Sequence, residues 1–511
     1  MQRNLGWMRV ALLLVVSGAL LITCGCMSYG SHSTSRPAPD GSEQYARTYE
    51  NKFTPAQAGI PSTFSIDVDT ASYTMVRRYV ANGKLPPPQA VRIEEMLNYF
   101  TYSYPEPQGD EEFSVKTEYS TCPWSPTHGL LLIGIKAKGA REANLSASNL
   151  VFLMDTSGSM NADNKMPLMK HSIKRLVEKL GTKDRISLIS FASRPKVRLD
   201  GSTTETKDAI LKAIDVLKTG GGTGGIRALE KAYEVALKNF IPNGNNRIIL
   251  CTDGGFNSDK DRFNSLKAFV SEKKGTGVAL TVLGCGSGDY RDDNLEMLAD
   301  SGDGNYFYID SHDEAYRVFD TALAGALETV AMDVKVLVDF NAGNVRSFRL
   351  IGYEDRMIDT RKFIEEDADA GELGAGHCVT ALYEIIAPES EYIEDEVKSK
   401  YTKESTDRPK TSSGGDLCTL RIRYKSAATG ENKKVERVIP STTEAFSAAS
   451  EDFRFASAVA EAGLVLRDSK LKDRANIAHA LSVAKVAQSA DPEGLRADFI
   501  SLLYQIIRRG K

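Results

Sequence analysis

The sequence is poor in the residue types that build metal clusters, redox centres and hydrolytic triads. Its 511 residues include only six histidines, seven cysteines and two tryptophans. The histidines form no pair at a helical metal-binding spacing, and the cysteines match no zinc or redox motif. No Ser-His-Asp, Cys-His or H-E-x-x-H arrangement can be read from the chain. These absences favour a protein that is not an enzyme.

An excess of positive charge is also missing. The 64 Lys and Arg residues oppose 68 Asp and Glu residues, which gives a formal net charge of −4. Recognition of nucleic acid normally requires a basic surface, so the charge balance excludes nucleic acid as the expected partner. The length is enough for about two to four domains.

Long apolar runs are absent except near the N-terminus. Arg3 and Arg9 belong to a positively charged start, and an apolar run follows at residues 10–22. This run is shorter than the ~20 residues that a membrane-spanning helix needs, and it is typical of a signal peptide. We therefore expect residues 1–26 to be a signal peptide that exports the protein.

The end of this run, Leu-Ile-Thr-Cys-Gly-Cys at residues 21–26, resembles a bacterial lipobox. The resemblance implies that Cys24 is lipidated, with Cys26 as the alternative. Acyl chains would then anchor the protein to the bacterial cell envelope, at the inner or outer membrane, on the periplasmic side or at the surface. An ordinary cleaved signal without lipid is the other possibility.

Oxygen-bearing side chains follow the apolar runs in the middle of the chain. Asp155-Thr156-Ser157-Gly158-Ser159 comes directly after one such run, and Asp253 comes directly after another. Thr223 lies in the glycine-rich run 220–225, which lacks the G-K-[ST] ending of a phosphate loop. Two carboxylates brought together would repel each other unless a cation neutralised them. Oxygen-only ligands favour hard divalent cations, above all Mg²⁺, with Mn²⁺ or Ca²⁺ as alternatives.

This trio of motifs resembles the metal-ion-dependent adhesion site of von Willebrand factor type A domains, over about residues 147–330. The resemblance implies a protein-binding domain in which a Glu or Asp carboxylate of a partner protein completes the metal coordination. It also implies that Asp253 acts mainly through water. The implied metal-binding residues are Asp155, Ser157, Ser159, Thr223 and Asp253.

Strand and helix patterns alternate across the same region. Near-continuous apolar strands separated by amphipathic helices predict a doubly wound, mostly parallel, Rossmann-like sheet that is covered on both faces. Ligands bind such sheets at the carboxyl ends of the strands, which is where Asp155 and Asp253 lie. The expected strands are 150–155, 186–190, 247–252, 278–283 and 306–309.

The flanking regions differ in character from the central one. Strand patterns occur at 113–135 on one side and at 332–353 and 418–424 on the other, and neither set is long enough for a confident sandwich alone. We expect the two sets to form one β-sandwich into which the central domain is inserted. The expected parts are a disordered tether at 27–52, an α+β segment at 53–146, the central domain at 147–330, a β-rich domain at 331–440 and a helical region at 441–511.

The N-terminal flank carries a second resemblance. The text Ser-Ile-Asp-Val-Asp-Thr-Ala-Ser-Tyr at 65–73 and the text Cys-Pro-Trp at 122–124 resemble bacterial YfbK-type von Willebrand factor A lipoproteins. These proteins carry such an N-terminal segment and a C-terminal domain of unknown function. Within the first text, we expect Asp69 or Thr70 to cap the helix that follows.

The sequence therefore predicts a metal-dependent protein-binding lipoprotein of the cell envelope, acting in adhesion or as a scaffold. One alternative is a scaffold that recruits an envelope ATPase or protease complex. A metal-dependent hydrolase is the remaining alternative.

Overall fold

The computed structural model describes residues 43–67, 69–139, 147–222, 224–255, 260–287, 290–319, 328–365, 370–390, 415–488 and 491–510. The predicted signal peptide, with Cys24 and Cys26, lies outside the described residues, and so does Thr223. In the part that is described, no helix combines the length and apolar character needed to cross a membrane.

The central domain is built on a six-stranded sheet. The strand order is β10-β9-β8-β5-β6-β7, and all neighbours are parallel except β6 and β7. Every residue of β5 is buried, as expected of a strand with both faces covered. The strands are β5 (Ser148–Asp155), β6 (Arg185–Phe191), β7 (Pro195–Thr203), β8 (Asn245–Thr252), β9 (Ala279–Cys285) and β10 (Tyr306–Ile309).

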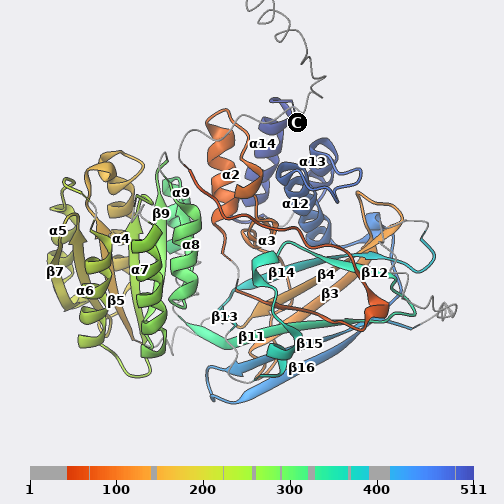
Figure 1. Ribbon diagram of the computed structural model, residues 1–511, viewed down its shortest axis with the longest axis horizontal. Coiled ribbons are helices and arrows are strands. Elements are labelled where there is room, and N and C mark those ends of the chain that lie inside the picture. The colour runs from red at the N-terminus through yellow and green to blue at the C-terminus, as the bar shows by residue number, and fades with distance from the viewer. Residues whose placement is uncertain are drawn as a thin grey trace, which may run out of the picture. The chain divides into compact units, whose positions relative to one another are not determined.

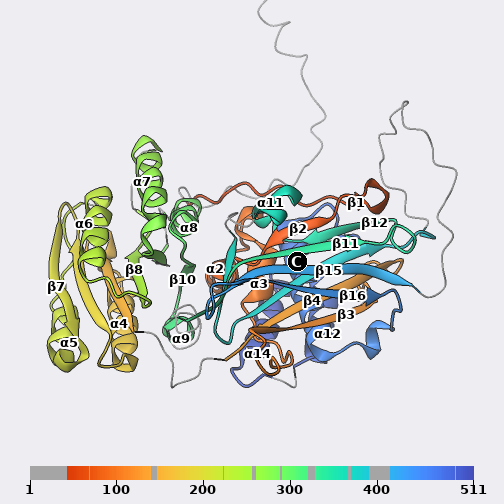
Figure 2. The same ribbon diagram turned by 90° about the horizontal axis from the view of Figure 1, so that it is seen from below.

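Helices cover both faces of this sheet, which confirms the predicted doubly wound fold (Figure 2). One face packs against α6 (Gly225–Lys238), α7 (Lys260–Lys273) and α8 (Asp292–Ser301). The other face packs against α4 (Met166–Lys179), α5 (Lys207–Asp215) and α9 (His312–Arg317).

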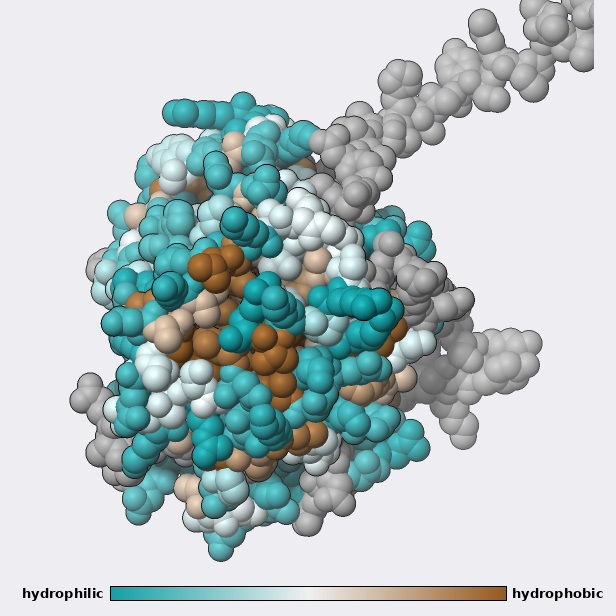
Figure 3. All heavy atoms as spheres, turned by 90° about the vertical axis from the view of Figure 1, so that its left-hand side faces the viewer, coloured by the Kyte–Doolittle hydropathy of each residue, from teal (hydrophilic) through white to brown (hydrophobic). Residues whose placement is uncertain are grey.

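The strand β7 was not expected from the sequence, because most of its residues are polar and none of them is buried. It forms one edge of the sheet, on the side of the molecule that Figure 3 shows, where apolar and hydrophilic side chains are mixed. Lys196 and Arg198 flank the exposed Val197 on this strand. Charged side chains on an edge strand oppose pairing with a strand of a second chain.

The flanking regions form a β-sandwich, as expected, from strands on both sides of the central domain. One sheet has the order β1-β12-β14-β4-β3, and β4 pairs with β14 along nine residues. The other sheet has the order β13-β11-β15-β16, with β2 paired to β11. The strands are β1 (Thr54–Pro55), β2 (Ser62–Ser65), β3 (Phe113–Thr121), β4 (His128–Ala137), β11 (Thr329–Phe340), β12 (Ser347–Ile351), β13 (Gly371–Gly374), β14 (Cys378–Ile386), β15 (Asp416–Ser426) and β16 (Asn432–Pro440).

The two ends of the central domain are held side by side on this sandwich. The backbone oxygen of Lys138, where the chain leaves the sandwich, accepts a hydrogen bond of 2.9 Å from Gly376 N. The backbone oxygen of Glu328, where the chain returns, accepts one of 2.7 Å from Ala375 N. Consecutive Cα atoms are about 3.8 Å apart, so the departure and return points are neighbours. This is the geometry that an inserted domain requires.

A third layer of helices covers the outer face of one sandwich sheet. In β4, Leu130 and Leu132 face a core shared with these helices, whereas Leu131 and Ile133 face the interior of the sandwich. Figure 1 shows the N-terminal helices of this layer beside the C-terminal ones. The helices are α2 (Ala71–Ala81), α3 (Ile93–Asn98), α12 (Glu451–Arg467), α13 (Ile477–Lys485) and α14 (Leu495–Ile507).

Candidate functional site

The loop after β5 gathers three of the predicted metal-binding side chains. Ser157 N donates a hydrogen bond of 2.8 Å to Asp155 Oδ1, which folds the loop back over the end of the strand. The hydroxyls of Ser157 and Ser159 lie 3.0 Å apart, so they converge on one point. Asp155 is fully buried, whereas Ser159 is exposed. The site is therefore buried at its inner end, at Asp155, and open to the surface at Ser159.

The glycine-rich run lies against this loop through its first residues, Gly220 and Gly221. Gly158 N donates a hydrogen bond of 3.0 Å to Gly221 O, and Gly220 N donates one of 2.8 Å to Thr156 O. Gly221 has φ +89°, a left-handed conformation that favours glycine. A Cβ on Gly224 would lie 2.7 Å from the backbone oxygen of Ser193, so that position has no room for a side chain. Thr223 remains a predicted ligand.

Asp253 joins the site from the end of the neighbouring strand β8. Thr252 Oγ1 donates a hydrogen bond of 3.0 Å to Asp155 Oδ2, which ties the two strand ends together. Burial raises the pKa of Asp155 above its ordinary value, and the negative charge of Asp253 adds to the rise. A positive charge is already present, because Lys165 Nζ lies 2.8 Å from Asp253 Oδ2. The sequence reasoning missed Lys165, since no part of the motif requires it.

These described residues fit a hard divalent cation. They offer two carboxylates that repel each other and two adjacent hydroxyls, of the buried Ser157 and the exposed Ser159, and all of the donors are oxygen atoms. Such a cation would supply the charge that lets both carboxylates stay ionised together. Asp155, Ser157 and Ser159 would hold it, with Asp253 as the second carboxylate.

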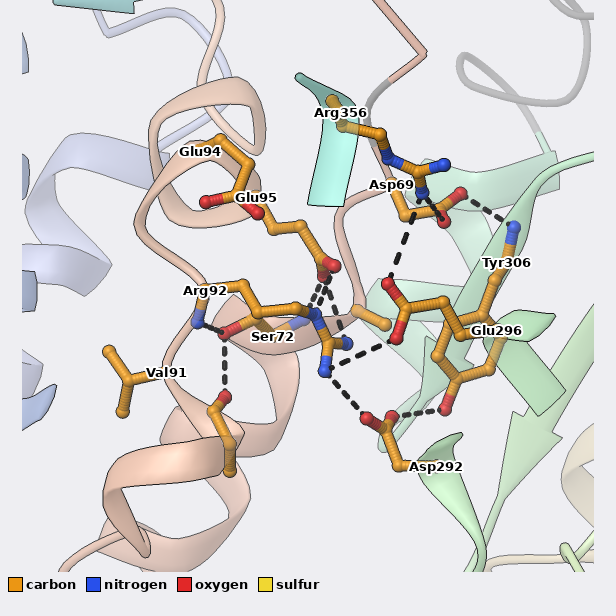
Figure 4. Close-up of polar contacts among 12 residues, drawn as sticks. Asp69, Ser72, Val91, Arg92, Glu94, Glu95, Asp292, Glu296, Tyr306 and Arg356 are labelled. Carbon is orange, nitrogen blue, oxygen red and sulfur yellow. Dashed lines mark hydrogen bonds and ion pairs between the residues drawn. The ribbon is translucent and has the colours of Figure 1, made fainter. Parts of the chain in front are cut away.

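A second group of carboxylates lies between the central domain and the N-terminal helices. Oxygen atoms of Asp69, Glu95 and Glu296 all lie within 4.8 Å of one another, a separation that could suit a metal. Figure 4 shows that guanidinium groups already fill this space. Arg92 contacts Glu95 through its Nε, and its Nη1 lies 2.6 Å from Asp292 Oδ2 and 3.6 Å from Glu296.

Arg356 completes this buried ion-pair cluster, lying 3.2 Å from Asp69 and 3.9 Å from Glu296. Burial raises the pKa of Asp69 and of Glu296 well above the ordinary value. Arg356 opposes the rise at both carboxyls, and Arg92 opposes it at Glu296. The two arginines compensate the negative charge of the carboxylates. We therefore interpret the cluster as a structural contact that connects α3, α8 and the sandwich. Sequence patterns do not indicate this cluster, because Arg92 and Asp292 are 200 residues apart.

The expected helix cap at Asp69 is wrong. Neither Asp69 nor Thr70 caps α2 through its side chain. Instead, Asp69 Oδ1 accepts a hydrogen bond of 2.7 Å from Tyr306 N, at the start of β10, while Oδ2 receives Arg356. The carboxylate therefore joins the N-terminal segment to the edge strand of the central sheet, an arrangement that local spacing cannot indicate.

A cavity of 370 Å³ lies where the central domain meets the sandwich. Its lining includes Arg247 near the start of β8, Asn305 just before β10, and His377, whose pKa is lowered to about 4 by burial. These residues of the central domain lie toward the amino ends of the strands. The cavity is therefore separate from the predicted metal site at the carboxyl ends.

Known proteins match the chain along most of its length. The family profile described as von Willebrand factor type A domain matches residues 149–321, and the profile described as von Willebrand factor matches residues 39–132. The profile described as Uncharacterized protein YfbK, C-terminal, matches residues 325–508.

Individual relatives agree with these matches. The chain is 37% identical over 473 residues to the Uncharacterized protein YfbK of Escherichia coli (strain K12), covering 91% of this chain and 81% of the relative. It is 27% identical over 243 residues to the Magnesium-chelatase 67 kDa subunit of Chlorobaculum tepidum, covering 41% of this chain and 38% of that subunit. A solved structure, von Willebrand factor type A from Catenulispora acidiphila, is 16% identical with a TM-score of 0.44 and covers 79% of this chain and 91% of that one.

Proposed function

Since the chain belongs to the YfbK family and contains a von Willebrand factor type A domain, we propose that this domain captures a protein partner through a divalent cation. Domains of this type serve protein interaction or scaffolding. In our proposal the cation is Mg²⁺, held by Asp155, Ser157, Ser159 and Thr223, with Asp253 acting mainly through water. A Glu or Asp carboxylate of the partner completes the coordination.

One observation carries this proposal. The hydroxyls of Ser157 and Ser159 converge at 3.0 Å beside the buried Asp155, and Ser159 is open to the surface. A cation bound there can keep an open position for an outside ligand. Ser157 Oγ hydrogen-bonds another hydroxyl rather than a base that would activate it, so we propose binding rather than catalysis.

The setting of this activity is part of the same proposal. The signal-like N-terminal sequence and the two cysteines at its end support an exported protein that is anchored to the cell envelope by acyl chains. A lipid anchor would hold the binding domain at a membrane surface without a membrane-spanning helix.

The test compares the native protein with Asp155→Ala. Calorimetric titration with MgCl₂ or MnCl₂ should show binding to the native protein and none to the variant, with circular dichroism unchanged. Capture of partners from envelope extract should require Mg²⁺ and disappear with EDTA. Asp208→Ala, which removes an exposed carboxylate of the same domain, is the matched control and should behave as native. Equal capture with Mg²⁺ and with EDTA would contradict the proposal.

A further inference from the structure

A half-buried lysine lies at the predicted metal site. Lys165 Nζ lies 2.8 Å from Asp253 Oδ2, with side-chain exposures of 13% for the lysine and 4% for the aspartate. Exposed ion pairs are common and weak, whereas this pair joins a half-buried ammonium group to a buried carboxylate and is less screened by water. The ammonium group is therefore a fixed part of the electrostatics of the site.

The protein backbone holds this lysine in place. A Cβ on Gly286, in the loop after β9, would collide with Cε of Lys165, and its distance to Cγ would be 2.9 Å. Gly286 has φ +82°, and its carbonyl accepts a hydrogen bond from the Tyr308 hydroxyl on β10. The lysine stem thus packs on a glycine whose position is set by the neighbouring strand. This packing directs the ammonium group to Asp253.

The ion pair also limits what Asp253 can offer. Its Oδ2 is taken by Lys165, and its Oδ1 receives Gly255 N at 3.3 Å. Each oxygen keeps a second lone pair, which can accept a hydrogen bond from a metal-bound water. This agrees with a role for Asp253 through water.

We propose that Lys165 sets the net charge of the metal site and so selects an acidic ligand. This inference rests on the proposed metal-dependent binding. A divalent cation would balance the charges of Asp155 and Asp253, and the ammonium group then leaves one positive charge over. A partner carboxylate neutralises that charge, whereas a neutral amide does not. The same ammonium group repels the metal. Lys165 therefore lowers the affinity for the metal while it raises the preference for an acidic ligand.

The test is Lys165→Met, which keeps the length of the side chain and removes its charge. Calorimetric titration with MnCl₂ should show metal binding about tenfold tighter than native, because the repulsion is gone. The acidic probe is the peptide Gly-Glu-Gly with acetyl and amide groups at its ends, so that the Glu side chain is its one carboxylate. Gly-Gln-Gly with the same end groups is its neutral counterpart. Displacement of water from bound Mn²⁺, followed by proton relaxation, should need about tenfold more Gly-Glu-Gly than in the native protein.

The opposite directions of these two effects separate an electrostatic role from a structural one, because damage to the loop would weaken both affinities. Lys165→Arg keeps the charge and should retain both affinities within about threefold. Lys174→Met, which removes a more exposed lysine of α4 that pairs with Asp215, is the control and should change neither.

The outcomes distinguish the two proposals. If the native protein binds no Mn²⁺, both the metal site and the role of Lys165 are overturned. If the native protein binds Mn²⁺ and Gly-Glu-Gly, but Lys165→Met shifts both affinities in the same direction or neither, only the role of Lys165 is overturned. Opposite shifts in Lys165→Met, absent in Lys165→Arg, support it.

Discussion

Arg92 provides the sharpest test of how the central domain is attached. Its side chain is 2% exposed and lies among Glu95, Asp292 and Glu296. Arg92→Met keeps an apolar stem of similar length but leaves three buried carboxyls without that guanidinium. Removal of one partner from a buried ion pair costs about 3–5 kcal/mol. We expect a loss of that size in the free energy of unfolding at pH 8.

The loss should shrink at pH 5. Arg92 opposes the effect of burial on the pKa of Glu296, so without the guanidinium that pKa rises further in the folded state. A carboxyl whose folded-state pKa is raised stabilises the protein only when it carries a proton. The measurement is urea denaturation followed by circular dichroism and by the fluorescence of Trp124, which is buried in the helical layer. Arg361→Met removes an arginine whose side chain is 87% exposed and should leave the midpoint unchanged. Equal midpoints for the two variants would refute this reasoning.

Three further predictions follow from other parts of the chain. Burial and the nearby Glu354 raise the pKa of Glu94 to about 7 from 4.5, so the stability that its proton provides is lost as pH rises from about 4.5 to about 7. Glu94→Gln should remove this loss, which is about 3 kcal/mol, and an unchanged dependence of unfolding on pH would contradict it. Replacement of residues 140–327 by a short Gly-Ser linker should leave a folded sandwich by circular dichroism, whereas cooperative unfolding of an isolated 331–511 fragment would contradict the shared sandwich. Palmitate labelling of the exported protein should disappear when Cys24 and Cys26 are both replaced by Ser, but not in Cys122→Ser, and labelling that persists in the double variant would rule out the lipid anchor.

The central sheet could be predicted because each of its parallel strands has a recognisable local sequence pattern. Buried strands such as β5 and β8 appear as continuous apolar runs, and a polar side chain follows each run at the carboxyl end. Parallel order then brings Asp155 and Asp253 to one edge without any further information. The antiparallel strand β7 escaped prediction because its exposed, charged residues carry no apolar pattern.

The ion pairs that join the central domain to the flanking regions could not be predicted, for a different reason. Arg92 and Arg356 each resemble ordinary surface residues in the sequence, and their partners on α8 come from a distant part of the chain. Lys165 likewise lies in a polar loop, and only the folded structure shows that it packs on Gly286 and pairs with Asp253. Local pattern indicates which side chains can bind a metal, whereas long-range packing decides which charges surround them.

The two edges of the central sheet are protected in different ways, and the difference bears on binding. Arg77 contacts Asp310 at the end of β10 through two hydrogen bonds, of 2.9 and 2.6 Å, while Asp69 binds Tyr306 N at the start of the same strand. The N-terminal segment thus holds the β10 edge along its length. Small polar interfaces allow domains to move relative to one another, but separating this one would expose buried, paired charges. A partner bound at the Asp155 loop would therefore act on a domain that the N-terminal segment holds along its β10 edge, whereas the β7 edge is protected by its own charged side chains.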